Sequence, residues 1–409
     1  MKNLKRVFWV FVLSFFAWAG IGNAGEILIG YTGPLSGPAA EYGRDCANGV
    51  EMAVQDINAA GGVKIKGEKY LFKLEKMDDR VDPTLALNNA RRIRAKGAIA
   101  VFNPVFTCIA ALKKINEEKD AAFILMGYTS TPMATEIANT LHISIPPPFT
   151  VYNSAFLDMA WKQGWRKAAM LITLGAYGDE NRVDFRQYWE KLGGTITTDK
   201  PANYYTETDF SSQLTAVLST KPDVIFAGGP SATTALVVEQ ARNMGFTGGF
   251  VFIDQARADY CASILKEKKL LDKTISVAAV DSIPFAGAIA FNKRYMNTYK
   301  RINNMEAVQN YMAMQALAKA IEAAGKVDDV VAIRAAFPKA FPLIGNQFPT
   351  EAHGITEDGR MMIFPYAQMV KEGKPTVPEV YAWWPKTEKE FQEVKKVTKS
   401  TSPLIWKTR

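Results

Sequence analysis

Small polar and aromatic side chains gather in loops that follow predicted strands, and these residues are the best suited to bind a ligand. The loops cover residues 31–37, 103–108, 127–132 and 176–179. Two of them run directly into predicted helices, and a helix N-terminus presents unpaired N–H groups that can hold a carboxylate. The hydroxyl groups of Thr107, Ser130 and Thr131 can complete such a cradle, or serve as simple helix caps. Together the loops predict recognition of a small polar ligand.

No recognisable catalytic motif accompanies these loops. The sequence contains neither the P-loop pattern G-x-x-x-x-G-K-[ST] nor the nucleophile elbow G-x-S-x-G. His142 and His353 are isolated, and two His with three Cys cannot form a zinc cluster of ordinary spacing. The pair Asp78-Asp79 is favoured as a hydrogen-bonding loop end, because no further ligand spacing accompanies it. We therefore predict no catalytic residue, no metal site and no cofactor.

Strand and helix patterns alternate twice along the chain, and this alternation positions the polar loops. Short apolar runs occur at residues 27–31, 70–74, 98–102, 123–126, 168–172, 224–227 and 249–253. Helical patterns separate them, including one that follows Asp82-Pro83 and ends near Lys96. Such alternation is typical of βαβ units on a parallel sheet, where ligands bind outside the carboxyl ends of the strands.

Two crossings between the series predict two lobes that are each discontinuous in sequence. A proline-stiffened segment at 143–149 leads into the second series, and residues 281–284 lead back. We predict an α/β fold with two Rossmann-like lobes on parallel sheets, joined by a multi-strand hinge. The first lobe is expected to contain residues 25–145 and 282–345, and the second 146–281 and 346–409. An alanine-rich helix is expected over 311–324, and the Lys-rich end beyond residue 384 as a solvated tail.

The first 24 residues have the three-part layout of a secretory signal. A basic start with Lys2, Lys5 and Arg6 precedes an apolar run of about 13 residues and a small-residue end at Ala24. The run is shorter than the roughly 20 residues that a membrane-spanning helix needs. We therefore predict cleavage after Ala24 and a soluble periplasmic protein.

Composition and cysteine content limit the remaining classes. Among 409 residues, 49 are Lys or Arg and 41 are Asp or Glu, and no basic tract concentrates the net charge of +8, so no nucleic acid partner is expected. Export makes disulfides possible. Cys46 and Cys108 lie near the starts of predicted helices and can pair, or these two and Cys261 are three separate buried thiols.

The segments around the first strand and helix resemble the type 1 periplasmic binding proteins, specifically their Leu/Ile/Val-binding branch. Residues 27–37 read ILIGYTGPLSG and residues 49–62 read GVEMAVQDINAAGG, supported by Asp78-Asp79 and Asp82-Pro83. The similarity runs over most of residues 26–385. It implies a two-lobed Venus-flytrap protein, without catalytic activity and expected to be monomeric. Such a protein closes on a solute and delivers it to the membrane permease of an ABC importer.

The resemblance also implies binding residues in the first lobe. The loop after the third strand usually offers a small hydroxyl residue to an amino acid carboxylate, and the matching residues here are Asn103, Phe106 and Thr107. The next loop usually supplies a small residue and a Ser or Thr, which here match Tyr128 and Ser130. Aromatic residues thus stand where smaller groups are common.

In the second lobe, the resemblance implies a tyrosine and an acidic residue. The tyrosine of the usual Tyr-Gly pair matches Tyr177, and the acid that neutralises the ligand ammonium falls at Asp254 or at its neighbour Gln255. If Asp254 faces the ligand, a branched-chain or related amino acid fits. If Gln255 does, an aromatic acid, another organic acid or an amide fits better, because an unpaired buried charge is unfavourable. An exported enzyme and a ligand-sensing receptor are the rival functions.

Overall fold

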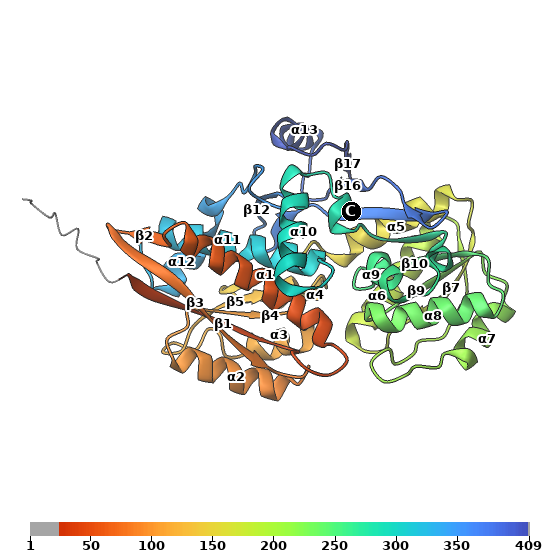
Figure 1. The fold of residues 1–409 in the computed structure, drawn as a ribbon, viewed down its shortest axis with the longest axis horizontal. Coiled ribbons are helices and arrows are strands. Elements are labelled where there is room, and N and C mark those ends of the chain that lie inside the picture. Colours follow the sequence, from red (N-terminus) through yellow and green to blue (C-terminus); the bar gives the residue numbers. More distant parts are fainter. Residues whose placement is uncertain (1–23, 408–409) are drawn as a thin grey trace, which may run out of the picture.

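The computed structural model describes residues 24–407, which form two α/β lobes lying side by side (Figure 1). The first lobe is built on the strands β1 (Gly25–Gly33), β2 (Val63–Ile65), β3 (Glu68–Asp78), β4 (Ala100–Asn103), β5 (Ile124–Gly127) and β6 (His142–Ser144). They form one sheet in the order β2-β3-β1-β4-β5-β6, in which β2 alone is antiparallel to its neighbour. β4 and β5 are buried along their whole length, as expected where helices cover both faces of a sheet.

The second lobe is built on a larger sheet. Its strands are β7 (Lys167–Ile172), β8 (Thr195–Asp199), β9 (Val224–Gly228), β10 (Gly249–Phe252), β11 (Thr274–Val277), β14 (Tyr366–Lys371), β15 (Lys374–Pro375), β16 (Glu379–Ala382) and β17 (Leu404–Trp406). The order is β17-β16-β14-β11-β10-β9-β7-β8, with β15 paired to β14. The pairs among β7 to β11 are parallel, and β14 joins β11 in the antiparallel direction.

Helices from two distant parts of the chain cover the first sheet. They are α1 (Ala40–Ala59), α2 (Pro83–Ala95), α3 (Phe106–Leu112), α4 (Met133–Glu136), α10 (Ala286–Tyr299), α11 (Met305–Ala324) and α12 (Val330–Ala336), followed by the 3-10 turn η3 (Phe337–Ala340). α1 packs against α11 so closely that a Cβ atom on Gly49 would lie 2.2 Å from the carbonyl oxygen of Ala307. An ion pair of 2.6 Å between Arg294 and Asp56 links α10 to α1.

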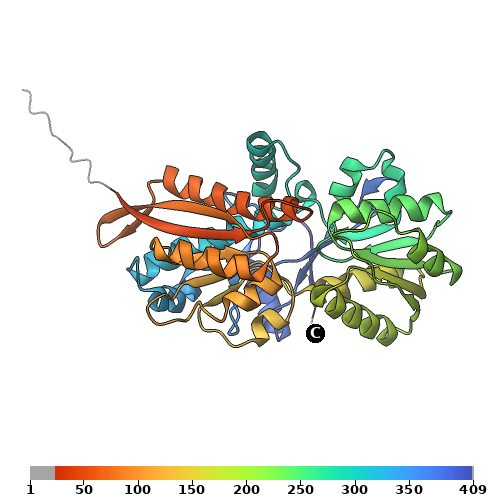
Figure 2. The same ribbon diagram turned by 90° about the horizontal axis from the view of Figure 1, so that it is seen from below.

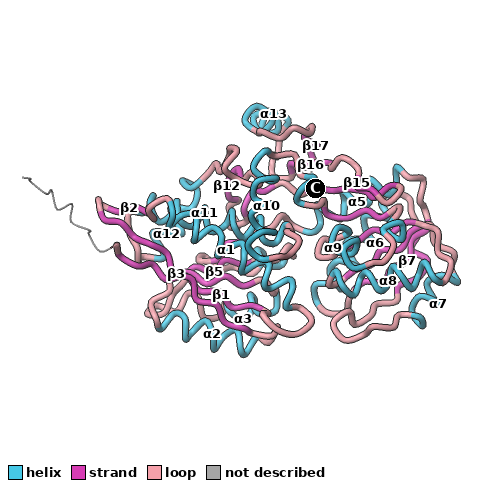
Figure 3. Tube along the Cα trace, viewed as in Figure 1, coloured by secondary structure: helices cyan, strands magenta, loops and turns pink. Residues whose placement is uncertain are grey.

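The second sheet has its own helices. They are α5 (Phe149–Lys162), α6 (Ala176–Lys191), α7 (Ser211–Ser219), α8 (Ser231–Asn243) and α9 (Ala258–Ile264), with the 3-10 turns η1 (Lys268–Leu271) and η2 (Val280–Ser282). Helices lie around the strands in both lobes (Figure 3). A side-chain cap fixes the start of α2 at the position expected from the sequence. Asp82 caps α2 by accepting hydrogen bonds from the backbone N–H groups of Thr84 and Leu85.

The expected helix over 311–324 begins six residues earlier, at Met305. The side chain of Asn304 accepts a hydrogen bond from the N–H of Ala307, which fixes this start. The first turn escaped sequence analysis because polar side chains in it, including Glu306 and Gln309, are buried. A helix buried on all sides shows no apolar stripe.

The expected solvated tail beyond residue 384 is wrong. That part of the chain forms α13 (Glu388–Val397) and then β17, which pairs with β16. Phe391 and Val394 are buried, and the ring of Phe391 stacks on Trp406 at a centroid distance of 5.7 Å. The two apolar residues three apart on α13 give the Lys-rich end a buried face.

Segment 346–409 contacts both lobes. A hairpin of β12 (Ala352–Ile355) and β13 (Met361–Ile363) bonds to the first lobe through a bridge between Ser144 and Arg360. The strands after it join the second sheet. Seen from below (Figure 2), chain segments cross between the lobes at the middle of the molecule. The lobe limits given above remain a prediction.

The structure distinguishes the two alternatives for the cysteines, and its helices can be tested for a membrane span. Cys46, Cys108 and Cys261 are all buried and free, so the structure has the three separate thiols and no Cys46–Cys108 bond. Among residues 24–407, no helix combines the length and the apolar character that crossing a bilayer requires.

Candidate ligand-binding site between the lobes

A cavity of about 110 Å³ lies between the lobes, with walls from both. Six of the eight residues expected to bind ligand line it: Phe106, Tyr128, Ser130, Tyr177, Asp254 and Gln255. Phe106 begins α3, Tyr128 and Ser130 follow β5, and the other three belong to the second lobe. The carboxyl ends of strands in two separate sheets therefore meet at one cavity, which is the position at which open α/β sheets bind ligands.

Local backbone geometry places Tyr177 at the cavity. Tyr177 is the second residue of α6. The helix begins directly after Gly175, whose φ of 103° is favourable for glycine. A Cβ atom on Gly178 would lie 1.8 Å from the carbonyl oxygen of Thr173, so the turn accepts only glycine there. The Tyr-Gly pair thus has a steric reason, and the turn fixes where the phenol ring points.

Asp254 and Tyr177 form the polar centre of the second-lobe wall. The Tyr177 hydroxyl donates a hydrogen bond to the Asp254 carboxylate, and the Ser130 hydroxyl donates another from the first lobe. Burial raises the pKa of Asp254, and the two hydroxyl donors oppose that rise. A carboxylate has about four lone-pair positions, so Asp254 still has capacity to accept from a ligand.

Both Asp254 and Gln255 line the cavity, so the two alternatives for the ligand-facing residue are compatible. The Oε1 atom of Gln255 is buried and has no hydrogen-bond partner among the described residues. A buried acceptor without a partner is unfavourable, and a ligand N–H group can supply the missing bond.

Asn103 and Thr107 are not among the residues that line the cavity. The Asn103 amide donates to the carbonyl of Thr32 at 2.7 Å and to the carboxylate of Asp79 at 3.0 Å, and its oxygen accepts from the N–H of Val105. Asn103 therefore connects neighbouring loops through hydrogen bonds and does not contact the cavity. Thr107 is exposed on the first turn of α3.

The Asp78-Asp79 pair also stabilises loops through hydrogen bonds. Asp78 accepts from the N–H groups of Leu35 and Arg80, and Asp79 accepts from that of Val81. These bonds fit the expected hydrogen-bonding loop end. Within residues 24–407, no group of three or more His, Cys, Asp or Glu side chains is arranged to hold a metal ion.

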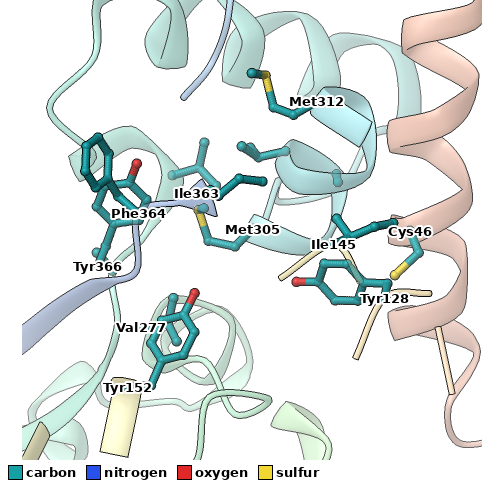
Figure 4. Packing of buried hydrophobic residues seen from close by; sticks show 14 of the residues in the cluster. Cys46, Tyr128, Ile145, Tyr152, Val277, Met305, Met312, Ile363, Phe364 and Tyr366 are labelled. Atoms are coloured by element: carbon teal, nitrogen blue, oxygen red, sulfur yellow. The ribbon is translucent and has the colours of Figure 1, made fainter. Parts of the chain in front are cut away.

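Five polar residues of the cavity wall escaped sequence analysis: Tyr42, Tyr152, Tyr205, Arg257 and Glu306. Figure 4 shows Tyr128 and Tyr152 on different elements, with Met305 near both. Tyr205 lies in the loop after β8, within the run Asn203-Tyr-Tyr205. A polar and aromatic loop after a strand is the pattern that could have indicated this residue from the sequence. The others lie on helices or beside them, where only packing decides that they face the cavity.

Arg257 of the second lobe meets acidic side chains of the first. Its Nη1 atom lies 3.8 Å from Glu306 at the start of α11 and 4.0 Å from Asp45 of α1. Its Nε atom lies 3.4 Å from Asp259 of its own lobe. Arg257 is 4% exposed and Glu306 5%. The charges therefore meet across the cleft with little water to screen them.

Burial of Glu306 predicts a pH-dependent stability. Burial raises the pKa of Glu306 from 4.5 to about 7, although Arg257 opposes the rise. Between these values the folded state holds a proton that the unfolded state has lost, so stability falls as pH rises through this window. We expect Glu306→Gln to raise the free energy of unfolding at pH 8 by up to about 3 kcal/mol and to change it little at pH 4. Urea denaturation without ligand measures this, and equal destabilisation at both pH values would contradict it.

Comparison with known proteins identifies the family. Residues 26–374 match the sequence profile of a family described as periplasmic binding protein. The chain belongs to the periplasmic binding protein family. The Leu/Ile/Val-binding protein BraC3 of Rhizobium johnstonii is 24% identical over 354 residues, which are 83% of this chain and 89% of the relative. The predicted family is confirmed.

Solved structures of similar proteins confirm the two-lobed fold. One is a branched-chain amino acid transporter substrate-binding protein of Streptococcus pneumoniae in complex with isoleucine. It has a TM-score of 0.72 at 20% identity, over 87% of this chain and 99% of that one. Another, from R. palustris and in complex with benzoate, has a TM-score of 0.73 at 20% identity, over 86% and 95% of the two chains.

Family membership also bears on function and location. Periplasmic binding proteins are solute-binding proteins, so the expected class of function is confirmed, and the periplasmic location agrees with the family. The expected signal segment lies outside the described residues, except for Ala24. The absence of catalytic activity, the monomeric state and the roles of the lining residues remain predictions.

Proposed function

We propose that this periplasmic binding protein binds an amino acid in the cavity between its lobes and delivers it to the permease of an ABC importer. One observation carries the proposal. The cavity wall contains two carboxylates, Asp254 and Glu306, and the unpartnered amide oxygen of Gln255. These groups accept hydrogen bonds and attract positive charge, which suits a ligand ammonium.

The charges of the wall favour an ammonium over a purely anionic ligand. Arg257 is the cationic side chain among the lining residues, and it already faces Asp259, Asp45 and Glu306. A ligand carrying only a carboxylate would bring a further negative charge to this wall. A zwitterion adds no net negative charge, and its ammonium can pair with the wall carboxylates.

Donors for the ligand carboxylate come from hydroxyl groups of both lobes. Tyr128 of the first lobe and Tyr152 of the second line the cavity and are buried, so their hydroxyl groups can donate to the ligand in surroundings of low dielectric, while the Ser130 hydroxyl donates to Asp254. Because the two lobes supply different contacts, only a closed protein makes all of them. Binding then shifts the population from open to closed.

The size of the cavity fits a small solute. A cavity of about 150 Å³ in another protein holds benzene, so a cavity of about 110 Å³ limits the ligand to a small solute. The relatives named Leu/Ile/Val-binding proteins support the same class. We propose that the protein acts as a monomer and catalyses no reaction.

A second candidate ligand is an aromatic acid. Five tyrosines and a phenylalanine line the cavity: Tyr42, Tyr128, Tyr152, Tyr177, Tyr205 and Phe106. Their rings offer the edge and face contacts that an aromatic ligand prefers. The fold accommodates such ligands, since the R. palustris protein binds benzoate.

A panel of matched ligands distinguishes the two candidates. We expect at least one of the twenty amino acids to raise the melting temperature, because a ligand of the folded state stabilises it. Calorimetry should then show that the same compound without its amino group binds at least 100-fold more weakly. The control is the compound without its carboxylate, which should also bind weakly. Tight binding of benzoate with no amino acid binding would contradict the proposal.

A further inference from the structure

Three buried polar atoms in the cavity wall have no hydrogen-bond partner among the described residues. They are Oε1 of Gln255, Nη2 of Arg257 and Oε2 of Glu306. Buried polar groups are normally paired, so each unpaired group needs a reason. Their meeting at one cavity indicates that a bound ligand completes them.

The Arg257 and Glu306 atoms form one recognition unit. Nε and Nη1 of Arg257 face carboxylates, which leaves Nη2 as the free donor. Nη1 of Arg257 forms an ion pair with Oε2 of Glu306 at 3.8 Å, which is too long for a hydrogen bond, so the donor and the acceptor that lack hydrogen bonds are neighbours. Both side chains are more than nine-tenths buried. The unit therefore presents a donor and an acceptor close together in the cavity wall.

The Arg257–Glu306 unit borders a second, smaller cavity, whereas Asp254 borders only the main one. A smaller cavity of about 20 Å³ adjoins the main one and shares Gln255, Arg257 and Glu306 with it. Ser130, Tyr177 and Asp254 line only the main cavity. A ligand whose ammonium meets Asp254 thus extends its other end toward Arg257 and Glu306.

The hydrogen-bonding needs of Arg257 and Glu306 limit which chemical group the other end of the ligand can carry. An aliphatic group leaves the donor and the acceptor unpaired, which is unfavourable for both. A carboxylate suits Arg257 but opposes Glu306, and an ammonium suits Glu306 but opposes Arg257. A primary carboxamide offers an oxygen to Arg257 and an N–H group to Glu306 from adjacent atoms.

We infer that the ligand carries a terminal carboxamide held between Arg257 and Glu306. The inference rests on the proposed function for the amino acid end and names the class of side chain. Glutamine and asparagine are amino acids of this class. The unpaired oxygen of Gln255 accepts from the second carboxamide hydrogen or from the ligand ammonium.

Calorimetry at pH 8 with near-isosteric ligands tests the inference. We expect L-glutamine or L-asparagine to bind at least tenfold more tightly than L-glutamate, L-aspartate and L-leucine. If leucine, isoleucine or valine binds most tightly, the carboxamide inference is wrong and the proposed function stands. If propionamide binds but no amino acid does, the carboxamide inference stands and the proposed function is wrong. Binding of benzoate alone, or of no ligand in the panel, overturns both.

A switch of preference tests the role of Glu306 directly. In Glu306→Gln the acceptor becomes an amide that also donates, and the negative charge is lost. We expect the affinity for L-glutamate relative to L-glutamine to rise at least tenfold at pH 8. The affinity ratio compares two ligands on the same folded variant, so it is independent of the change in stability expected for Glu306→Gln. The control Glu393→Gln, an exposed position on α13, should leave the ratio unchanged. An unchanged ratio in Glu306→Gln would overturn the assignment.

Discussion

Asp254→Asn is expected to weaken amino acid binding by a factor of about 100 or more, equivalent to about 3 kcal/mol. Asp254 is the carboxylate that both Tyr177 and Ser130 orient toward the cavity. Asparagine keeps the shape and one acceptor but removes the negative charge that balances the ligand ammonium. The loss is large because the ammonium is buried when the lobes close.

The unliganded Asp254→Asn protein should be at least as stable as the wild type. Burial raises the pKa of Asp254, which means that the empty cavity disfavours its charge. Calorimetry gives the affinity and thermal unfolding gives the stability. Asp281→Asn, the same change at an exposed residue of η2, serves as the control and should alter neither. Undiminished affinity in Asp254→Asn would remove the carboxylate from the proposed ammonium site.

Arg360→Ala is expected to lower the free energy of unfolding by about 3 kcal/mol. Arg360 is 2% exposed and lies between β12 and β13. Its Nη atoms donate to the carbonyls of Pro146 and Thr131 at 2.8 Å each, and to that of Thr129 at 3.3 Å. One side chain thus holds the loops after β5 and β6, and alanine leaves their buried carbonyls without these donors.

The same substitution should also weaken ligand binding, because Tyr128 and Ser130 stand on the loop that Arg360 holds. Urea denaturation followed by circular dichroism measures stability, and calorimetry measures affinity. Arg92→Ala, at an exposed position on α2, should change the free energy of unfolding by less than about 0.5 kcal/mol. Similar effects of the two substitutions would show that Arg360 does not anchor these loops.

Much of the fold follows from local sequence rules. The buried runs of β4 and β5 and the Asp82-Pro83 start of α2 are readable because each depends on neighbouring residues. The end of the chain is different. Whether a Lys-rich segment is a tail or a helix depends on what Phe391 packs against, and Trp406 supplies that contact.

Some residues of the candidate site could likewise be predicted from the sequence, and others could not. Tyr128, Ser130, Tyr177 and Asp254 follow strand ends, and strand ends in parallel sheets meet at one edge, so sequence order placed them. Asn103 and Thr107 follow a strand too, yet one bonds to neighbouring loops and the other faces solvent. Which way a loop side chain turns depends on partners that are remote in sequence.

The order of residues by itself determined the alternation of strands and helices, and with it two lobes whose loops supply hydroxyl and phenol groups to a shared cleft. Only the tertiary structure decided that Arg257 and Glu306 meet across that cleft. The physical reason is distance along the chain: local patterns report which face of an element is apolar, but charge pairing between separate lobes arises only when the folded halves approach each other.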